Sequence, residues 1–467
     1  MLVGFMGAGK STLGHGLAHR LGRAFVSTDT LVEERVGMSV EQVFTERGET
    51  AFRELEEEAV ADALWRREPA VVEIGGGAVA SQRTRDALRG GALTILLEVS
   101  VEEAWERVAG SARPLAQDRE SFRALFAERR ALYESVADVQ ARDVEDVVLA
   151  AAGIHLEEGA ASALATLLPE GRAIELVVDE NVEPLHGARA REALGERLLA
   201  THVVPAGEAA KTADNALRLW SALRLDRNGA IVALGGGATM DLAGFVAATY
   251  LRGVPWVAVP TTLVAQVDAA IGGKTAIDLD EGKNLVGAFH WPARVVVDPG
   301  LLATLPKEER THGLAEVVKM GLLAGERLWE LPTAEQVRRC AAFKAAICLR
   351  DPFDEGERAQ LNLGHTFAHA LEAASGYGLS HGRAVALGLV AALRLSGLAG
   401  EADEVGELLD ARPVSVDREA AWAALARDKK AARGQLRLVL LTAPGQPRSG
   451  VRADEREVRA ALDALIE

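Results

Sequence analysis

The sequence lacks the features that mark secreted, membrane-bound or nucleic-acid-binding proteins. Only two cysteines occur among 467 residues, which excludes a disulfide framework and fits a reducing compartment. No segment approaches the roughly 20 consecutive apolar residues of a membrane span. Basic residues number 52 against 68 acidic ones, and the net charge of -16 disfavours nucleic acid and anionic membranes. We therefore expect a cytoplasmic enzyme that binds small anionic molecules through local lysines and arginines, with no nucleic acid or membrane partner.

The chain is too long for a single hydrophobic core, since domains commonly contain roughly 100 to 200 residues. Up to about residue 300, short apolar runs alternate with amphipathic segments, which is typical of parallel α/β sheets. From Leu301 onward strand-like runs become rare, and long stretches rich in Ala, Leu, Glu and Arg favour helices. The pattern predicts an α/β protein with a domain over 1–143, a second α/β domain over 144–300 and a mostly helical domain over 301–467.

Residues 4–12, "GFMGAGKST", form a phosphate-binding motif between an apolar stub and a helical pattern. Gly4, Gly9, Lys10 and Ser11 satisfy G-x-x-x-x-G-K-[ST], in which backbone N–H groups surround the phosphates of a nucleotide. Lys10 reaches the terminal phosphates and Ser11 holds Mg²⁺. We expect ATP with Mg²⁺ to bind the following residues of this loop: Gly7, Gly9, Lys10, Ser11 and Thr12.

The residues that follow this loop, in their order along the chain, closely resemble shikimate kinase. The resemblance covers residues 1–143 and rests on five further features: Asp29, Arg53, Gly75 to Gly77, Arg113 and Arg129. It implies a P-loop kinase fold that phosphorylates shikimate to shikimate 3-phosphate. One departure is Ser27, where the family usually has an acidic residue near the metal.

The resemblance to shikimate kinase also implies a role for each residue. Asp29 would hold the ring hydroxyls of the substrate and orient the attacking one. Arg53 and Arg129 would pair with the substrate carboxylate, since planar guanidinium groups bind carboxylates in a bidentate manner. The backbone at Gly75, Gly76 and Gly77 would face the substrate, and Arg113 would lie on a lid over the transferring phosphoryl group. Lys10, Asp29 and Arg113 are then the candidate catalytic residues.

The helical region contains a set of metal-ligand residues. Glu316, His365 and His381 provide one carboxylate and two imidazoles, which suits one Zn²⁺ with open positions for substrate oxygens. His365 and His369 share a helical face within "HTFAH", but the glutamate of a zinc protease is absent.

A glycine cluster precedes this region. Residues 235–237 follow a predicted strand and come before Asp241, without the spacing G-x-G-x-x-G. By itself such a cluster is a weak signal for dinucleotide binding.

From about residue 144 to its end the chain resembles 3-dehydroquinate synthase. The resemblance rests on a series of segments in the order of that family: "VVDENVEPL", "PAGEAAK", "ALGGGATMDLAGFVAATYLRG", "VPTTLVAQVDAAIGGKTAID", "GKNLVGAFH", "GLAEVVKMG", "LNLGHTFAHALE" and "LSHGRAVALG". It implies a Rossmann-like NAD-binding α/β domain over 144–300 and a helical domain for metal and substrate over 301–467. One departure is Arg383, where the family usually has a glutamate after the third metal ligand.

The resemblance to 3-dehydroquinate synthase also implies the ligands of each group. One Zn²⁺ (or Co²⁺) would bind Glu316, His365 and His381. The NAD⁺ cofactor would contact Asp179, Glu208, Lys211, Gly235, Gly236, Gly237, Asp241, Thr261, Thr262 and Lys283. The anionic substrate would contact Arg252, Asp268, Lys274, Asn284, Lys344, Arg358, Asn362, His369, Lys429 and Lys430. Of these, Lys274 and His369, together with Lys319, would be catalytic.

The implied reaction converts 3-deoxy-D-arabino-heptulosonate 7-phosphate to 3-dehydroquinate and phosphate. In it NAD⁺ takes hydride from a secondary alcohol, phosphate leaves by β-elimination, and the hydride is returned. A homodimer through this part of the chain is left open.

Three alternatives stay open at this point. The second part of the chain fits a metal-dependent polyol dehydrogenase, although its many lysines argue against a neutral substrate. Either half fits a catalytically dead regulatory module, because of Ser27 and Arg383. For Lys429 and Lys430, a role as ordinary solvated surface charges is as well supported as a role in substrate binding.

Overall fold

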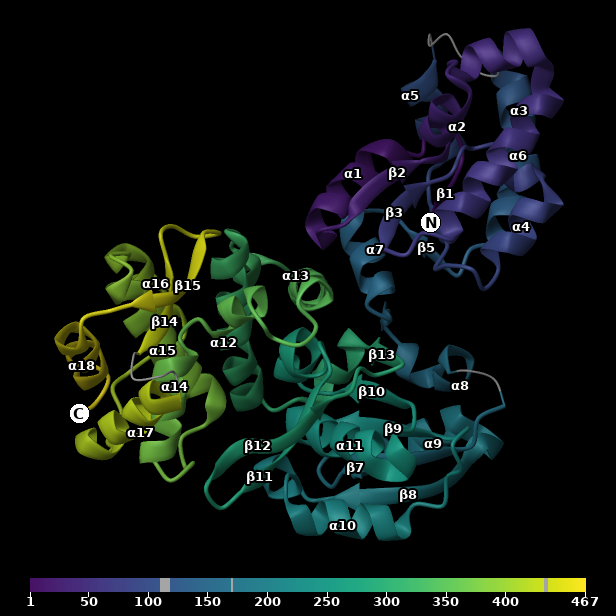
Figure 1. Cartoon of the computed structure of the whole chain (residues 1–467). Coiled ribbons are helices and arrows are strands. Elements are labelled where there is room, and N and C mark those ends of the chain that lie inside the picture. The colour runs from purple at the N-terminus through teal and green to yellow at the C-terminus, as the bar shows by residue number, and fades with distance from the viewer. Residues whose placement is uncertain (110–117, 169–170, 432–435) are drawn as a thin grey trace. The chain divides into compact units, whose positions relative to one another are not determined.

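The computed structural model describes residues 1–109, 118–168, 171–431 and 436–467, without the side chains of 427–431. The chain forms two compact units, Met1–Ala151 and Ala152–Glu467 (Figure 1). The expected division at 143, 300 and 467 stays a prediction about where independent domains end. The two units are described separately below.

The first unit is built on a five-stranded parallel sheet in the order β2-β3-β1-β4-β5. Its strands are β1 (Leu2–Val3), β2 (Ala24–Ser27), β3 (Ala70–Glu73), β4 (Ile95–Leu97) and β5 (Val139–Ala141). Seven α-helices are described around it: α1 (Lys10–Leu21), α2 (Thr28–Val36), α3 (Val40–Leu64), α4 (Gln82–Leu88), α5 (Val101–Val108), α6 (Arg119–Glu134) and α7 (Val144–Ala151). The parallel α/β class predicted for this part of the chain is confirmed.

The core of the first unit lies between the sheet and its helices. Strand residues such as Val72 and Leu96 pack with Phe122 and Tyr133 of α6. Helix α1 packs closely against β2 and β3, and Gly14 makes this approach possible. A Cβ atom at position 14 would lie 2.5 Å from a ring carbon of Phe25, so a larger residue would push the helix away.

The second unit contains a six-stranded parallel sheet in the order β6-β13-β10-β9-β7-β8. Its strands are β6 (Ile154–Leu156), β7 (Ile174–Asp179), β8 (Leu198–Val204), β9 (Ala230–Gly235), β10 (Trp256–Pro260) and β13 (Arg294–Val297). Strands β7, β9 and β10 are wholly buried, as expected for the middle of a parallel sheet. Helices α8 (Leu164–Leu167), α9 (Ala188–Leu194), α10 (Ala213–Ala222) and α11 (Gly237–Thr249) accompany this sheet. An antiparallel hairpin, β11 (Lys274–Leu279) and β12 (Gly282–Phe289), packs beside α11 (Figure 1).

The rest of the second unit is mostly helical, as the change of pattern after Leu301 predicts. Its helices are α12 (Lys307–Ala324), α13 (Thr333–Arg350), α14 (His365–Ala374), α15 (His381–Leu395), α16 (Ala399–Leu408), α17 (Arg418–Ala431) and α18 (Glu455–Asp463). One hairpin, β14 (Arg437–Leu441) with β15 (Pro447–Arg452), interrupts them. Helix α15 is buried over most of its length and packs against α12, α14 and α16. Among the described residues, none of the helices has both the length and the apolar composition that crossing a bilayer requires.

Helix α7 belongs structurally to the first unit, because it packs on α1. Val147, Val148 and Leu149 of this helix are buried. We predict that residues 1–151 unfold at a temperature about 10 °C or more above residues 1–143. Losing three buried aliphatic side chains costs several kcal/mol, at about 1.5 to 3 kcal/mol each. Thermal unfolding followed by circular dichroism measures the difference, and equal midpoints would contradict the packing described here.

Candidate active sites

The P-loop of the first unit joins β1 to α1. Gly7 and Gly9 adopt left-handed φ values of 82° and 85°, which glycine tolerates best. A Cβ atom at Gly7 would lie 2.6 Å from the carbonyl oxygen of Ala104. The Lys10 side chain is buried and its Nζ donates to the carbonyl oxygen of Gly4 over 2.9 Å. Lys10 is thus held inside the loop, and Thr12 is exposed in the first turn of α1.

Ser11 has an acidic partner that the motif does not contain. Its Oγ donates to Glu73 Oε1 over 2.8 Å, and Glu73 is the last residue of β3. A hydroxyl and a carboxylate oxygen are the hard ligands that Mg²⁺ prefers, so this pair fits the metal of Mg·ATP. Sequence reasoning missed Glu73, because only the pairing of strands brings it to the P-loop.

Arg53, which is predicted to bind the substrate carboxylate, lies in α3 close to Glu56. Sequence reasoning did not single out Glu56. Arg53 Nη1 donates to Glu56 Oε2 over 2.6 Å, and Glu56 is buried. Asp29 lies close by, since a Cβ atom at Gly75 would be 2.9 Å from Asp29 Oδ1 and 2.3 Å from Glu56 Oε1. A Cβ atom at Gly77 would overlap the guanidinium of Arg53 at 2.3 Å. A side chain at either position would therefore displace the charged ends of Glu56 or Arg53.

Arg129 reaches the same turn from α6. Its Nη1 donates to the carbonyl oxygen of Gly76 over 3.2 Å, and the Tyr133 hydroxyl donates to that oxygen over 2.5 Å. The structure therefore brings together Asp29, Arg53, Arg129 and the glycine turn, whereas Arg113 lies outside the described residues.

A cavity of about 530 Å³ lies beside the P-loop. Its lining includes Phe5 and Ala8 of the loop, Arg107 of α5 and Arg142 after β5. Arg107 Nη1 donates to the carbonyl oxygen of Gly7 over 3.0 Å. Arg107 is a further basic residue at the nucleotide loop that sequence reasoning did not single out.

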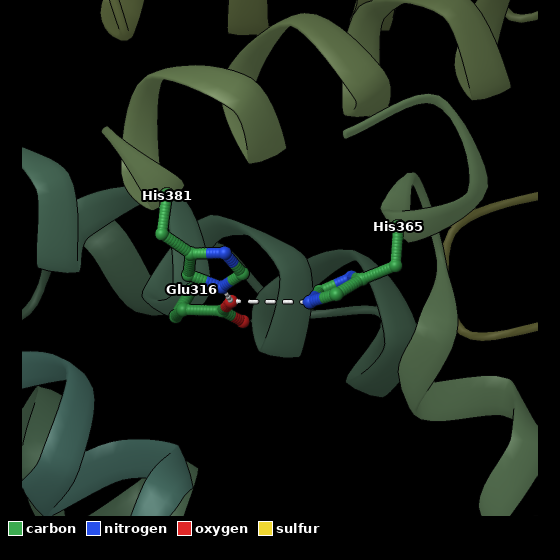
Figure 2. A group of neighbouring side chains, drawn as sticks. All are labelled: Glu316, His365 and His381. Carbon is green, nitrogen blue, oxygen red and sulfur yellow. Dashed lines mark hydrogen bonds and ion pairs between the residues drawn. The ribbon is translucent and has the colours of Figure 1, made fainter. Parts of the chain in front are cut away.

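In the second unit, the three predicted metal ligands come from three different helices and meet at one point (Figure 2). The Nε2 atoms of His365 and His381 lie 3.4 and 3.3 Å from the same oxygen, Oε1 of Glu316. One ligand atom from each residue falls within 4.8 Å of the others. The donor set of two imidazoles and one carboxylate fits a single Zn²⁺ or Co²⁺ ion.

The remaining ring nitrogen of each histidine is also positioned. His365 Nδ1 lies 3.2 Å from the carbonyl oxygen of Leu363, and His381 Nδ1 lies 3.5 Å from Glu372 Oε1. Such contacts fix the ring orientation and leave Nε2 for the metal. Arg383, which replaces a usual glutamate, is exposed, and the buried Glu372 of α14 supplies the carboxylate instead.

The electrostatic environment gives Glu316 and His365, but not His381, the protonation state that binds a metal. Burial, together with the nearby Lys319 ammonium, lowers the pKa of His365 to about 4, so its imidazole is neutral at pH 7. Burial acts to raise the pKa of Glu316, but Lys319 and His365 outweigh it and hold this pKa well below its ordinary value. A neutral imidazole and an ionised carboxylate are the forms that ligate a metal. Burial acts to lower the pKa of His381, but Glu316 and Glu372 outweigh it and raise this pKa to about 9, so a metal ion would displace a proton there.

Two predicted lysines converge on Asp268 next to the metal ligands. Lys319 Nζ lies 2.9 Å from Asp268 Oδ2 and 2.6 Å from Glu316 Oε2. Lys344 Nζ contacts the Asp268 carboxylate and donates to the Asp268 carbonyl oxygen over 2.7 Å. Burial lowers the pKa of Lys344 to about 8. His369 lies beside this group, with its ring centroid 5.5 Å from that of His365.

The predicted cofactor residues form a second cluster where β9 turns into α11. A Cβ atom at Gly235 would lie 2.6 Å from Thr239 Oγ1, and one at Gly237 would lie 3.0 Å from the Ala269 side chain. The glycine turn thus brings its backbone close to its neighbours without the fingerprint spacing. Thr261 follows β10, and its buried Oγ1 has no hydrogen-bond partner within the part of the chain that the structure describes, which fits a polar group of a bound cofactor.

Lys211 organises the charges of this cofactor cluster. Its Nζ lies 2.9 Å from Asp241 Oδ2, 3.7 Å from Glu208 Oε2 and 2.5 Å from Asn284 Oδ1. Burial raises the pKa of Asp241 to about 6, against the effect of Lys211. Asn284, predicted to bind the substrate, therefore contacts a residue predicted to bind the cofactor.

Lys283 joins the cofactor cluster to the metal site. Its Nζ lies 3.8 Å from Glu208 Oε1 and 3.3 Å from Glu372 Oε1, and it lies over the ring of Tyr377.

The other predicted residues of the second unit occupy various positions. Lys274 pairs with Asp354 over 2.5 Å, and the buried Arg358 donates to the carbonyl oxygen of Gly272 over 2.8 Å. Asp179 ends β7 and accepts from the Asn181 backbone, and the Thr262 hydroxyl accepts from the Ala265 N–H. Arg252 and Asn362 are exposed. The backbone of Lys429 and Lys430 belongs to α17, but their side chains lie outside the described residues.

Comparisons with known proteins agree with this geometry. The family model for shikimate kinase matches residues 6–157, and the models for the N-terminal and C-terminal parts of 3-dehydroquinate synthase match residues 201–312 and 313–431. The 3-dehydroquinate synthase of Symbiobacterium thermophilum is 43% identical over 329 residues, which cover 64% of this chain and 92% of that protein. The chain belongs to the 3-dehydroquinate synthase family. It carries a shikimate kinase domain ahead of the synthase.

Further relatives extend the comparison. The 3-dehydroquinate synthase of Methylococcus capsulatus is 43% identical over 326 residues, 63% of this chain and 90% of its own length. The structure of 2-epi-5-epi-valiolone synthase from Streptomyces hygroscopicus, with NAD⁺ and Zn²⁺ bound, is 26% identical with a TM-score of 0.59 and covers 67% of this chain and 96% of that one. A 2-deoxy-scyllo-inosose synthase structure, 24% identical with a TM-score of 0.59, covers 66% of this chain and 95% of that one and shares the fold. Membership in the synthase family replaces the polyol dehydrogenase as the interpretation of the second unit.

Glu56 gives the kinase unit a pH dependence that can be measured. Burial raises its pKa to about 7, against the effect of Arg53, whereas the ordinary value is 4.5. A carboxyl group whose pKa is higher in the folded than in the unfolded protein contributes most to the free energy of unfolding below pH 4.5. This contribution to stability is lost as the pH rises through 7. We predict that Glu56→Gln gains stability relative to the wild type by about 1 to 3 kcal/mol between these pH values. Urea unfolding of residues 1–151 measures it, with Glu54→Gln on the same helix as control, and a pH-independent difference would contradict the assignment.

Proposed function

We propose that the two units catalyse two steps of aromatic amino acid biosynthesis. The first unit phosphorylates shikimate to shikimate 3-phosphate with ATP. The second converts 3-deoxy-D-arabino-heptulosonate 7-phosphate to 3-dehydroquinate and phosphate. The observation that carries this proposal is the meeting of Glu316, His365 and His381 in a chain whose two parts match these two families.

In the first unit, the proposed roles follow from charge and position. Lys10 lies inside the P-loop, where its ammonium group neutralises charge on the transferring phosphoryl group. Asp29 orients the attacking hydroxyl, and Arg53 and Arg129 hold the substrate carboxylate against the glycine turn. Glu56 accepts a hydrogen bond from the guanidinium of Arg53 and thereby fixes its position. These residues position two reactants and neutralise charge, which is most of what phosphoryl transfer requires.

The cavity beside the P-loop is proposed to take the nucleoside part of ATP. It adjoins the loop that binds the phosphates, and Arg107 borders both. Arg113, which lies outside the described residues, is proposed to contact the phosphates. Ser11 and Glu73 would hold Mg²⁺, which would supply positive charge to offset that of the phosphates.

In the second unit, Glu316, His365 and His381 are proposed to hold Zn²⁺ or Co²⁺, and the turn at 235–237 with Asp241, Lys211 and Thr261 to hold NAD⁺. When bound, NAD⁺ accepts and returns a hydride, and the metal polarises substrate oxygens. Glu372 fixes the ring of His381, as the carbonyl of Leu363 fixes that of His365.

The lysines of the second unit are proposed to hold the charged groups of the substrate. Lys319 and Lys344 share Asp268, so their positions are set before the substrate arrives. With a pKa near 8, Lys344 exchanges a proton at little cost near neutral pH. Lys274, Arg358 and His369 complete the anionic pocket in this proposal, with His369 placed beside the metal ligands.

The proposal also covers the location, the partners and the assembly of the protein. A cytoplasmic location fits the presence of only two cysteines, and small anionic partners fit the lysines and arginines that gather at the two sites. A homodimer through the synthase unit is proposed as the assembly.

The kinase assignment is tested with Lys10→Ala. We predict that this variant loses ATP-dependent phosphorylation of shikimate by about three orders of magnitude, because one charge on the phosphoryl group is no longer neutralised. Phosphate release by the synthase unit of the same preparation serves as the control and should be unchanged. Undiminished kinase turnover would refute the assignment of the P-loop.

The synthase assignment is tested with His365→Ala. We predict that this variant loses both metal binding and phosphate release, because one of three protein ligands is removed. In the wild type, phosphate release should proceed with catalytic amounts of NAD⁺ and without lasting absorbance from NADH. NADH formed in step with substrate would indicate a dehydrogenase, and full activity of metal-free protein would refute the metal site.

A further inference from the structure

The contact between Glu73 and the P-loop has a consequence for the metal of the kinase unit. Ser11 Oγ donates to Glu73 Oε1 over 2.8 Å, and Glu73 ends β3. Ser27 ends the adjacent parallel strand β2 and is in register with Glu73. Residues in register on neighbouring parallel strands point to the same face of a sheet. Positions 27 and 73 therefore present their side chains side by side, at the strand ends beside the start of α1.

P-loop enzymes hold Mg²⁺ with the serine or threonine of the loop and with an acidic residue from a nearby strand. The serine at position 27 cannot fill the acidic role. We propose that Glu73 is the carboxylate that holds Mg²⁺ together with Ser11, directly or through one of the waters that this ion retains. The acidic group that the family usually has at the end of β2 is then supplied by the neighbouring strand β3. This inference rests on the proposed kinase function of the first unit.

A second role for Glu73 would be to fix the rotamer of Ser11 without contributing charge to the metal. Glu73→Gln separates the two roles, because glutamine keeps an oxygen that accepts from Ser11 but carries no charge. The measurement uses the full chain with Mn²⁺ as a paramagnetic substitute for Mg²⁺ and with a non-hydrolysable ATP analogue. Electron paramagnetic resonance then reports metal affinity without any turnover.

We predict that Glu73→Gln weakens Mn²⁺ binding by about 10- to 100-fold. Glu68→Gln removes an exposed carboxylate just before the other end of the same strand and should bind Mn²⁺ as the wild type does. Unchanged affinity in Glu73→Gln would overturn the proposal.

The exchange variant S27D/E73S gives a test that does not depend on the stability of Glu73→Gln. It keeps one carboxylate and one hydroxyl at the two strand ends, but the carboxylate now lies on β2 and the hydroxyl on β3. We predict Mn²⁺ affinity close to that of the wild type, because both positions face the same ion. Affinity as low as that of Glu73→Gln would overturn the proposal.

These outcomes can be told apart from failure of the kinase function itself. The metal site of the synthase unit is filled with Zn²⁺ beforehand and shikimate is absent from the binding measurement, so the differences in Mn²⁺ affinity between the variants report on position 73. Wild-type protein that binds Mn²⁺ with the nucleotide analogue but fails to phosphorylate shikimate would refute the proposed function and leave the role of Glu73 supported.

Discussion

In the synthase unit, the carboxylate of Glu316 is fully buried and touches two imidazoles and one ammonium group. A buried charge is costly unless it is paired, so the surrounding residues are constrained by it. Lys319 balances Glu316 and also contacts Asp268, which in turn holds Lys344. On the other side, His381 contacts Glu372, which holds Lys283 at the edge of the cofactor cluster. One series of alternating charges thus connects the substrate lysines, the metal ligands and the cofactor turn.

The kinase unit also contains a buried acidic side chain that is paired with a basic one. Glu56 is buried against Arg53, and a Cβ atom at Gly75 or Gly77 would overlap the side chains of this pair. The raised pKa of Glu56 shows that the pairing only partly offsets the cost of burial. In the proposed kinase function, charges that are in place before the substrate binds favour recognition of a carboxylate at the expense of the stability of the empty protein.

Sequence patterns predicted the parallel sheets, the helical region and the residues of local motifs. The P-loop is continuous in sequence, and Glu316, His365 and His381 belong to segments that resemble one family, so both could be found without a structure. Glu56, Glu73 and Glu372 could not, because each is one of 68 acidic residues and carries no local motif. Their roles depend on strand register and on helix packing, which bring distant residues together. The expected division at 143 stays a prediction, and the place of α7 in the first compact unit could not be found from the sequence either, because the contacts of its apolar residues with α1 and β5 depend on the fold.

The central claim is that one carboxylate and two imidazoles hold a single metal ion in the synthase unit. X-ray absorption at the zinc edge of the Zn²⁺-loaded full chain tests it most directly. The account predicts nitrogen and oxygen ligands at about 2.0 to 2.2 Å, with the multiple-scattering pattern of two imidazoles. A sulfur ligand at about 2.3 Å, which only Cys340 or Cys348 could provide among the cysteines, or the pattern of a single imidazole, would contradict it.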